Sequence, residues 1–152
     1  MTNNDVLRRI RYTFDLGDDA MVETFALAGE TVTRAEVSDW LKRDEDEAFV
    51  PITDYQLAVF LNGFIVRRRG PKDGPAPVAE AVMTNNIVLN KLKIALALKA
   101  DDVLALVCSK ELKISRHELS AFFRKPGHKH YRSCMDQVLR NFMQGMQAKY
   151  RP

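Results

Sequence analysis

The chain has 152 residues, of which 46% are hydrophobic and 28% charged, with 23 Lys and Arg against 20 Asp and Glu. This composition is typical of globular proteins and excludes a disordered chain, a collagen-like fibre and a disulfide scaffold. No apolar run reaches the roughly 18 residues that a membrane helix needs, so the sequence predicts no membrane partner. Charges interrupt the first apolar residues too often for an export signal, and we expect a cytoplasmic protein with Cys108 and Cys134 as free thiols.

Apolar residues recur at helical spacing over four segments of the first 69 residues, and no segment shows the alternation of a strand. The predicted helices cover about residues 4–14, 18–28, 33–41 and 53–68. Asn3 or Asn4 is expected to cap the first helix, and Gly29 fits just past the end of the second. Thr33 and Glu36 form a capping box at the start of the third helix. The predicted fold class is therefore all-α.

The second half of the chain repeats the first. The sequence MTNN at residue 1 returns at residue 83, and a shift of 82 positions aligns residues 1–64 with 83–146 without a gap. Between the copies, the segment 70–82 is rich in Pro and Gly, which is typical of a linker. We therefore predict a tandem duplication of a four-helix module, with repeats at residues 1–69 and 83–152.

The second and third predicted helices of each copy resemble a helix-turn-helix, in the runs AGETVTRAEVSDWL and KELKISRHELSAFF. Their apolar residues have the spacing of a recognition helix packed on its partner. The turn is about two residues longer than the usual three to four, and Glu111 in the second copy replaces Gly29 of the first. Insertion into a nucleic-acid groove and an ordinary helical hairpin both remain open.

Arg34 and its counterpart Arg116 each follow the cap of the third helix, where a cation opposes the helix dipole. One interpretation is a phosphate contact at the helix start, which in the second copy would include His117. The interpretation that we favour is a salt bridge, and its carboxylate partners would be Asp19 and Asp101 or Asp54 and Asp136. Within predicted helices, Gly63 and Gly145 indicate close helix packing, because Gly costs about 1 kcal/mol there relative to Ala.

The loop after the third helix differs most between the copies. In the first copy it reads LKRDEDEAFV, with the acidic run Asp44, Glu45, Asp46 and Glu47. In the second copy it reads FRKPGHKHYR, with the basic and aromatic residues Arg124, Lys125, His128, Lys129, His130, Tyr131 and Arg132. The charge of the two halves follows the same division. Residues 1–82 hold 10 Lys and Arg against 15 Asp and Glu, and residues 83–152 hold 13 against 5, so the net charges are −5 and +8.

These loops support two functional hypotheses. A basic loop with aromatic and imidazole groups suits phosphate contacts and base stacking, so DNA or RNA is the first expected partner. Alternatively, the acidic loop of one module docks on the basic loop of another, in a protein-interaction adaptor or a homo-oligomer. A metal site at His128, His130 and Cys134 has weak support, because no fourth ligand is evident and the neighbouring cations oppose it.

The sequence contains no GxxxxGK[ST], GxGxxG, HExxH or GxSxG motif. We therefore expect a non-enzymatic binding or regulatory protein that has no catalytic residues, no cofactor, no metal and no small-molecule substrate.

Several segments together resemble one family. They are MTNN-x-VL at both module starts, WLKR with acidic residues after it, FLNGFIVRRRG, and LSAFFRKPGHKHYRSCMDQVLRNFMQGM with its specific RKPGHK-x-YR core. These segments resemble the YehS family across nearly the whole chain. The resemblance implies a small cytoplasmic bacterial protein built from two related helical domains of unknown function. It carries over no catalytic or binding residue.

Overall fold

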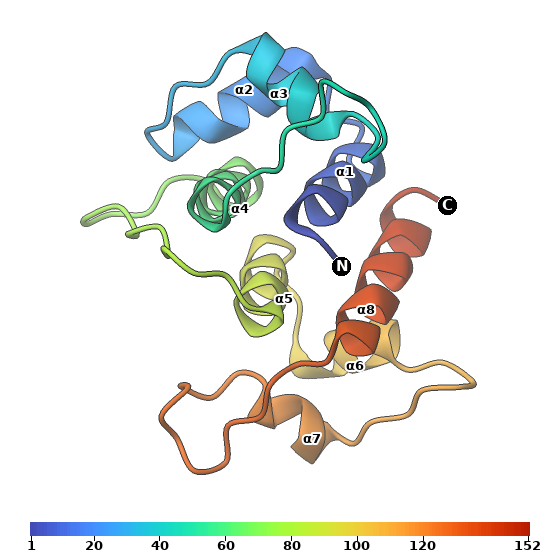
Figure 1. Cartoon of the computed structure of the whole chain (residues 1–152). Helices are drawn as coiled ribbons and strands as arrows, with labels where there is room; N and C mark the ends of the chain where they lie inside the picture. The colour runs from blue at the N-terminus through green and yellow to red at the C-terminus, as the bar shows by residue number, and fades with distance from the viewer. The chain divides into compact units, whose positions relative to one another are not determined.

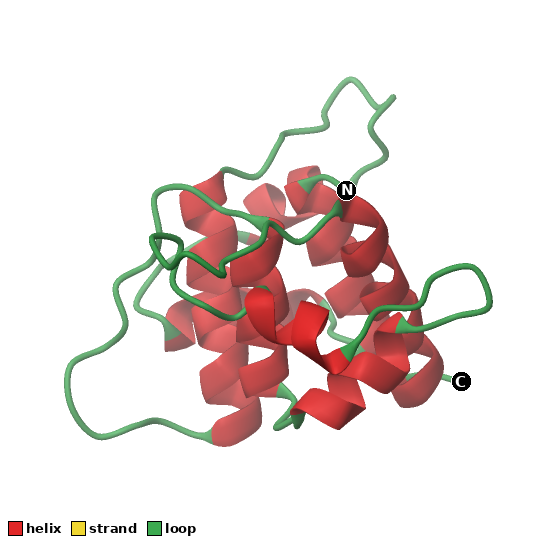
Figure 2. Cartoon of the chain, turned by 90° about the horizontal axis from the view of Figure 1, so that it is seen from below, coloured by secondary structure: helices red, strands yellow, loops and turns green.

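The computed structural model describes all 152 residues as α-helices joined by loops, with no β-strand (Figures 1 and 2). The helices are α1 (Asn3–Thr13), α2 (Asp18–Leu27), α3 (Arg34–Leu41), α4 (Asp54–Arg69), α5 (Asn85–Ala95), α6 (Ala100–Val107), α7 (Arg116–Ala121) and α8 (Asp136–Tyr150). The all-α prediction is confirmed. None of these helices combines the length and the apolar character that crossing a bilayer requires.

The chain divides into two compact units, Met1–Met83 and Thr84–Pro152, each with four helices. In the first unit α2 packs against both α4 and α3, and in the second α6 packs in the same way against α8 and α7. Asp15 and Ala97 share a left-handed backbone conformation, with φ of 52° and 53°, at the turn after the first helix of each unit. Because these two residues are 82 positions apart, the repeat in sequence is also a repeat in structure.

The first helix of each unit begins after a threonine. Thr2 Oγ1 accepts the Asp5 N–H at 3.1 Å, and Thr84 Oγ1 accepts the Ile87 N–H at 3.2 Å. The prediction that Asn3 or Asn4 caps the first helix is wrong, because both residues already lie inside it. Thr2 holds the extended backbone conformation that a cap requires, which leaves the two asparagine side chains free for other contacts.

The capping boxes predicted at the third helix of each unit are present. Thr33 Oγ1 accepts the Glu36 N–H at 3.1 Å, while the Glu36 carboxylate accepts the Thr33 N–H at 3.0 Å. Ser115 and Glu118 make the same reciprocal pair, at 3.0 and 3.1 Å. Each box satisfies two N–H groups that a helix start leaves without partners, which explains why α3 and α7 begin where they do.

Gly63 and Gly145 lie where two helices of a unit cross closely, as their positions predicted. A Cβ atom on Gly63 would stand 1.8 Å from the backbone oxygen of Thr24 in α2. A Cβ atom on Gly145 would stand 2.6 Å from the backbone oxygen of Leu106 in α6. Only a residue without a side chain lets α4 approach α2, and α8 approach α6, so closely. These two close crossings define the central helix pair of each unit.

Candidate nucleic-acid interface

The basic loop, which we define as residues 124–132, joins α7 to the segment before α8. All of its residues are exposed except Tyr131, which is half-buried. None of its Lys and Arg side chains pairs with a carboxylate, and Arg132 donates only to the backbone oxygen of Tyr131, at 2.9 Å. The loop therefore presents four unneutralised positive charges, which are those of Arg124, Lys125, Lys129 and Arg132.

The buried side chain of Asn86 holds both ends of the basic loop. Its Nδ2 donates to the backbone oxygens of Phe122 at 3.0 Å and Arg132 at 2.8 Å. Its Oδ1 accepts the N–H of Cys134 at 2.9 Å. Because this buried amide makes all three hydrogen bonds, it fixes the positions of both ends of the basic loop. The cations are therefore carried by a loop of defined shape. This role was not predicted from the sequence, although the asparagine at the second position of both α1 and α5 was a usable signal.

A tight turn shapes the middle of the basic loop. His128 Nδ1 accepts the N–H of His130 at 3.0 Å, and the two imidazole rings lie 5.5 Å apart. The equivalent segment of the first unit, residues 42–50, is the acidic loop. There Asp46 Oδ1 accepts the N–H of Ala48 at 2.9 Å in the same turn. The two loops therefore share one backbone framework and carry opposite charge.

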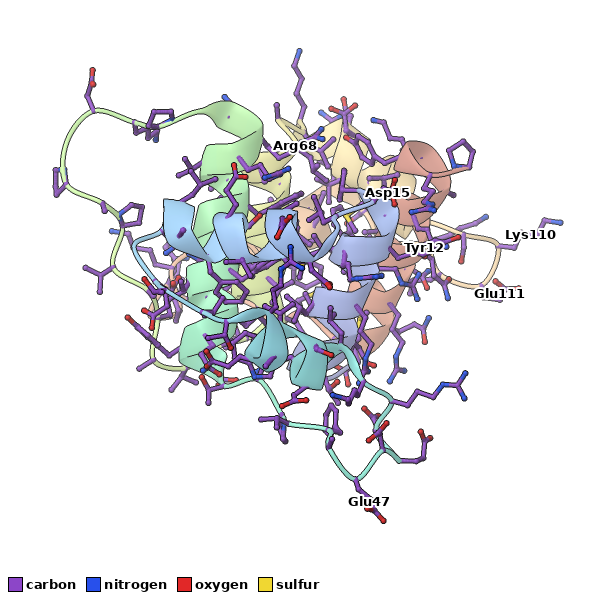
Figure 3. All side chains as sticks on the ribbon, turned by 90° about the horizontal axis from the view of Figure 1, so that it is seen from above. Tyr12, Asp15, Glu47, Arg68, Lys110 and Glu111 are labelled. Carbon is purple, nitrogen blue, oxygen red and sulfur yellow. The ribbon has the colours of Figure 1, made fainter.

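Two of the four carboxylates in the acidic loop are already engaged within their own unit. Asp44 pairs with Arg8 at 2.8 Å, and Asp46 accepts the hydrogen bond of its turn. Glu45 and Glu47 are exposed and make no hydrogen bond or ion pair. Figure 3 shows Glu47 at the outer end of this loop, pointing away from the helices. The loop thus offers two free negative charges.

Arg116 and His117 lie on the first turn of α7, at the opposite end of this helix from the basic loop. Arg116 pairs with Asp101, as Arg34 pairs with Asp19 in the first unit. The salt-bridge interpretation with Asp19 and Asp101 therefore describes both arginines.

The other two carboxylates considered for these arginines bind asparagines instead. Asp54 accepts from Asn3 at 2.6 Å and Asp136 accepts from Asn85 at 2.8 Å. A hydrogen bond from the backbone N–H of Met83, together with that from Asn3, lowers the pKa of the Asp54 carboxyl. The Asn85 hydrogen bond likewise lowers the pKa of Asp136. Both groups are therefore held in the charged form, beside the start of α4 and of α8.

The residues considered for a metal do not form a cluster. No group of three or more His, Cys, Asp and Glu side chains is placed to hold a metal ion. Cys134 is 4% exposed, and burial, followed by the nearby Asp136 carboxylate, raises the pKa of its thiol to about 12. Because the thiolate is the form that coordinates a metal, a buried thiol with a raised pKa is a poor ligand.

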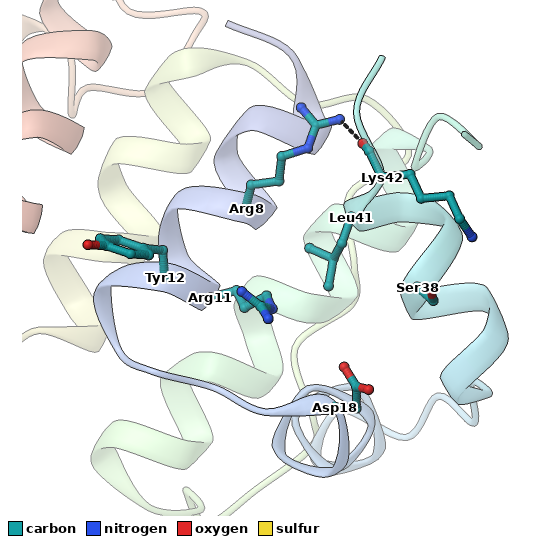
Figure 4. Close-up of a pocket in the computed structure, with 7 residues that line it drawn as sticks. All are labelled: Arg8, Arg11, Tyr12, Asp18, Ser38, Leu41 and Lys42. Carbon is teal, nitrogen blue, oxygen red and sulfur yellow. Dashed lines mark hydrogen bonds between the residues drawn. The ribbon is translucent and has the colours of Figure 1, made fainter. Parts of the chain in front are cut away.

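Three hollows lie beside the loops. One of about 760 Å³ lies against the acidic loop and is lined by Arg8, Leu41 and residues 43–46. A hollow of about 490 Å³ in the first unit lies between α1, α2 and α3 (Figure 4). There Arg8 reaches across to donate to the backbone oxygen of Lys42 at 2.6 Å, while Arg11 and Asp18 line the same space. A smaller hollow of about 270 Å³ in the second unit lies between the start of α5, the end of α7 and the basic loop. The sequence indicated none of these hollows, because each is formed by residues that are distant in the chain.

Comparison with known proteins finds similarity over nearly the whole chain. A family model described as "Protein of unknown function (DUF1456)" matches residues 3–70 and 85–151, one segment in each unit. The protein named "Uncharacterized protein YehS" from Escherichia coli (strain K12) is 40% identical over 151 residues, which cover 98% of this chain and 96% of that protein. No solved structure matches. The two matched segments agree with the tandem repeat.

Proposed function

The chain belongs to the DUF1456 family, and from that premise we propose that its second unit binds nucleic acid through the basic loop, without catalysing a reaction. The observation that carries the proposal is a set of four exposed cations with no carboxylate partner. Asn86 holds this loop in shape before any ligand arrives. A framework ordered in advance loses less entropy on binding than a mobile basic tail.

Contact through the loop is a better proposal than insertion of a recognition helix. In the second unit α6 and α7 are joined by residues 108–115, twice the length of an ordinary helix-turn-helix turn. Helix α7 has only six residues, so it is about 9 Å long. Its N-terminal Arg116 is engaged with Asp101. We therefore assign the main contacts to residues 124–132 and a secondary role to Arg116 and His117.

Fluorescence anisotropy with labelled DNA and RNA, titrated with salt, tests this function. We expect affinity to fall steeply with salt, with a slope in the double-logarithmic plot of about −3 for four contacts with a single strand. Replacing Lys125 and Lys129 by Ser should weaken binding and reduce the slope by about 1.4. The matched control replaces Lys110 (labelled in Figure 3) and Lys113 by Ser, both of which lie in the loop between α6 and α7. It removes the same charge and should bind like the unmodified protein.

Absence of binding to either nucleic acid at low salt would contradict the proposal. Equal losses in the two double variants would also contradict it, because they would indicate attraction by net charge alone.

A second candidate function is self-association, with the acidic loop of one copy docked on the basic loop of another. The observation in its favour is the pair Glu45 and Glu47, which are exposed and free on a framework that matches the basic loop. Light scattering over a range of concentrations tests it, with Glu45→Lys and Glu47→Lys combined. This variant leaves the Asp44–Arg8 pair intact. We expect reversal to lower the measured mass, and a protein that is monomeric with and without the substitutions would contradict self-association.

A further inference from the structure

The hollow of about 270 Å³ in the second unit has aromatic walls and opens beside the basic loop. Phe123 and Tyr131, both half-buried, line it together with Ile87 and Asn90 of α5. Its volume is near the lower end of the range found for small-molecule sites, so it suits one planar ring system better than a larger ligand.

In the first unit the equivalent sequence position holds an arginine, whose guanidinium uses the ring and the carbonyl while the side chain also lines hollows of about 490 and 760 Å³. Arg8, the counterpart of Asn90, donates to the backbone oxygen of Lys42 at 2.6 Å and pairs with Asp5 at 3.0 Å. It also pairs with Asp44, and its guanidinium lies 5.5 Å from the centre of the Phe49 ring. The guanidinium is therefore a planar donor that lies over an aromatic ring, is bound to a carbonyl and is neutralised by two carboxylates.

The second unit keeps part of this arrangement and loses the rest. Tyr131 stands where the first unit has Phe49, and the backbone of Arg124 stands where Lys42 supplies its carbonyl. Asn90 replaces the arginine, while the two carboxylates, Asp5 and Asp44, are replaced by Ile87 and Pro126. The aromatic ring and the carbonyl thus remain, without the planar donor that uses them in the first unit.

The charge around the hollow selects what can enter. A second arginine, from another chain, would meet the basic loop with no carboxylate to neutralise it, so a cation is disfavoured. A neutral planar group that carries an N–H donor and an attached anion can contact all three features. The planar group stacks on the ring, the N–H donates to the carbonyl, and the anion pairs with the cations. A nucleobase on a phosphate backbone has this chemistry. Bases in a duplex are already paired and stacked, so only a single strand can offer one.

We propose that the hollow accepts one base of a single-stranded nucleic acid, whose phosphates lie along the basic loop. This inference rests on the proposed function and specifies its ligand. The base stacks on Tyr131, and its exocyclic amine donates to the Arg124 carbonyl, in the place of the Arg8 guanidinium. Adenine, cytosine and guanine carry such an amine and bind better than thymine or uracil.

The test copies the arginine arrangement of the first unit into the second. Ile87→Asp combined with Asn90→Arg places a guanidinium where the base would contact the Tyr131 ring and the Arg124 carbonyl, and it leaves the net charge unchanged. The probes are eight-nucleotide oligo(dA), oligo(dT) and an abasic oligonucleotide of the same length, with oligo(rA) as the RNA arm. The unmodified protein should bind oligo(dA) about tenfold more tightly than the abasic probe. The double variant should bind both at the abasic level, with an unchanged salt slope.

Two further variants keep the test independent of folding. Tyr131→Ala removes the aromatic ring on which the base would stack, at a half-buried position. It should abolish the preference for oligo(dA) over the abasic probe. Tyr131→Phe restores the residue found in the first unit and should keep the preference. Circular dichroism verifies that each variant is folded.

The outcomes separate this inference from the function on which it rests. If no probe binds at low salt, nucleic-acid binding itself is wrong and the inference is overturned with it. If all probes bind equally, or if the double variant keeps the preference for oligo(dA), the hollow is not a base site. In that case the basic loop remains a site for phosphate alone.

Discussion

Gly63→Ala is expected to destabilise the first unit, although alanine is the better helix former. The added Cβ would stand 1.8 Å from the Thr24 backbone oxygen and 2.9 Å from its carbonyl carbon. Backbone atoms cannot rotate away, so α2 must shift relative to α4 by more than 1 Å to restore ordinary contact. Overpacking of this kind costs about 1–3 kcal/mol and occasionally more, while the gain in helix propensity is about 1 kcal/mol. Because the clash is severe, the cost lies at or above the upper end of this range, and we expect a net loss of about 2 kcal/mol or more.

Gly145→Ala in the second unit should have the same sign and a smaller size. Its nearest atom, the Leu106 oxygen, is 2.6 Å from the added Cβ, so a shift of less than 1 Å relieves the contact. We expect a net loss of about 1–2 kcal/mol. Gly127→Ala is the control, because no atom lies within 4 Å of its Cβ position and its φ is not in the left-handed region.

Urea and thermal denaturation measure these differences. Circular dichroism follows both units, and the fluorescence of Trp40, the single tryptophan and 2% exposed in the first unit, follows Gly63→Ala. A loss of 2 kcal/mol should lower the melting temperature by roughly 10 °C in a unit of this size. A Gly63→Ala protein as stable as the unmodified chain would refute the close approach of α2 and α4. So would a Gly127→Ala protein that is equally destabilised.

Three further predictions follow from local geometry. Ala97→Gly should stabilise the second unit by about 0.5–1 kcal/mol in denaturation, because Ala97 holds φ of 53° without being glycine; a loss would contradict this. In the native protein a thiol reagent at neutral pH should modify Cys108, which is half-buried, and spare Cys134, whose pKa is raised to about 12 and whose side chain becomes reactive only after unfolding. Because the pKa of Asp54 is lowered in the folded state, its stabilising contribution is present above about pH 4 and lost as the pH falls further. Asp54→Asn should therefore reduce stability at pH 7 and make progressively less difference on acidification, and a pH-independent difference would exclude the ionised carboxylate as the cause.

Much of the fold is readable from the sequence, because its signals are local. The capping boxes at Thr33 and Ser115 depend on residues three positions apart, and the helices depend on a period of 3.6. Gly63 in an apolar helical pattern correctly indicated a close helix crossing. The expected cap at Asn3 or Asn4 failed because two kinds of residue that favour caps, Thr and Asn, are adjacent there. Thr2 is the residue with the extended backbone conformation of a cap, whereas Asn3 and Asn4 lie within the helix.

The candidate site is readable only in part. Its charge is visible in the sequence, and so is the contrast between the acidic and basic loops. Its framework is not, because Asn86 binds backbone groups 36, 46 and 48 positions away. The arginine arrangement of the first unit is equally non-local, since Arg8 reaches residues 34 and 36 positions further along the chain. Neither set of contacts leaves a periodic or short-range signal.

The sequence by itself thus determined the helical class, the duplication and the opposite charge of the two copies, because periodicity, self-similarity and composition are properties of the chain alone. The tertiary structure decided what the duplicated positions do. Folding brings α1 beside the acidic loop and α5 beside the basic loop, and only there does the change from Arg8 to Asn90 decide whether a guanidinium lies over the aromatic ring of the loop. The effect of a substitution between the two copies therefore depends on the side chains that folding places around it.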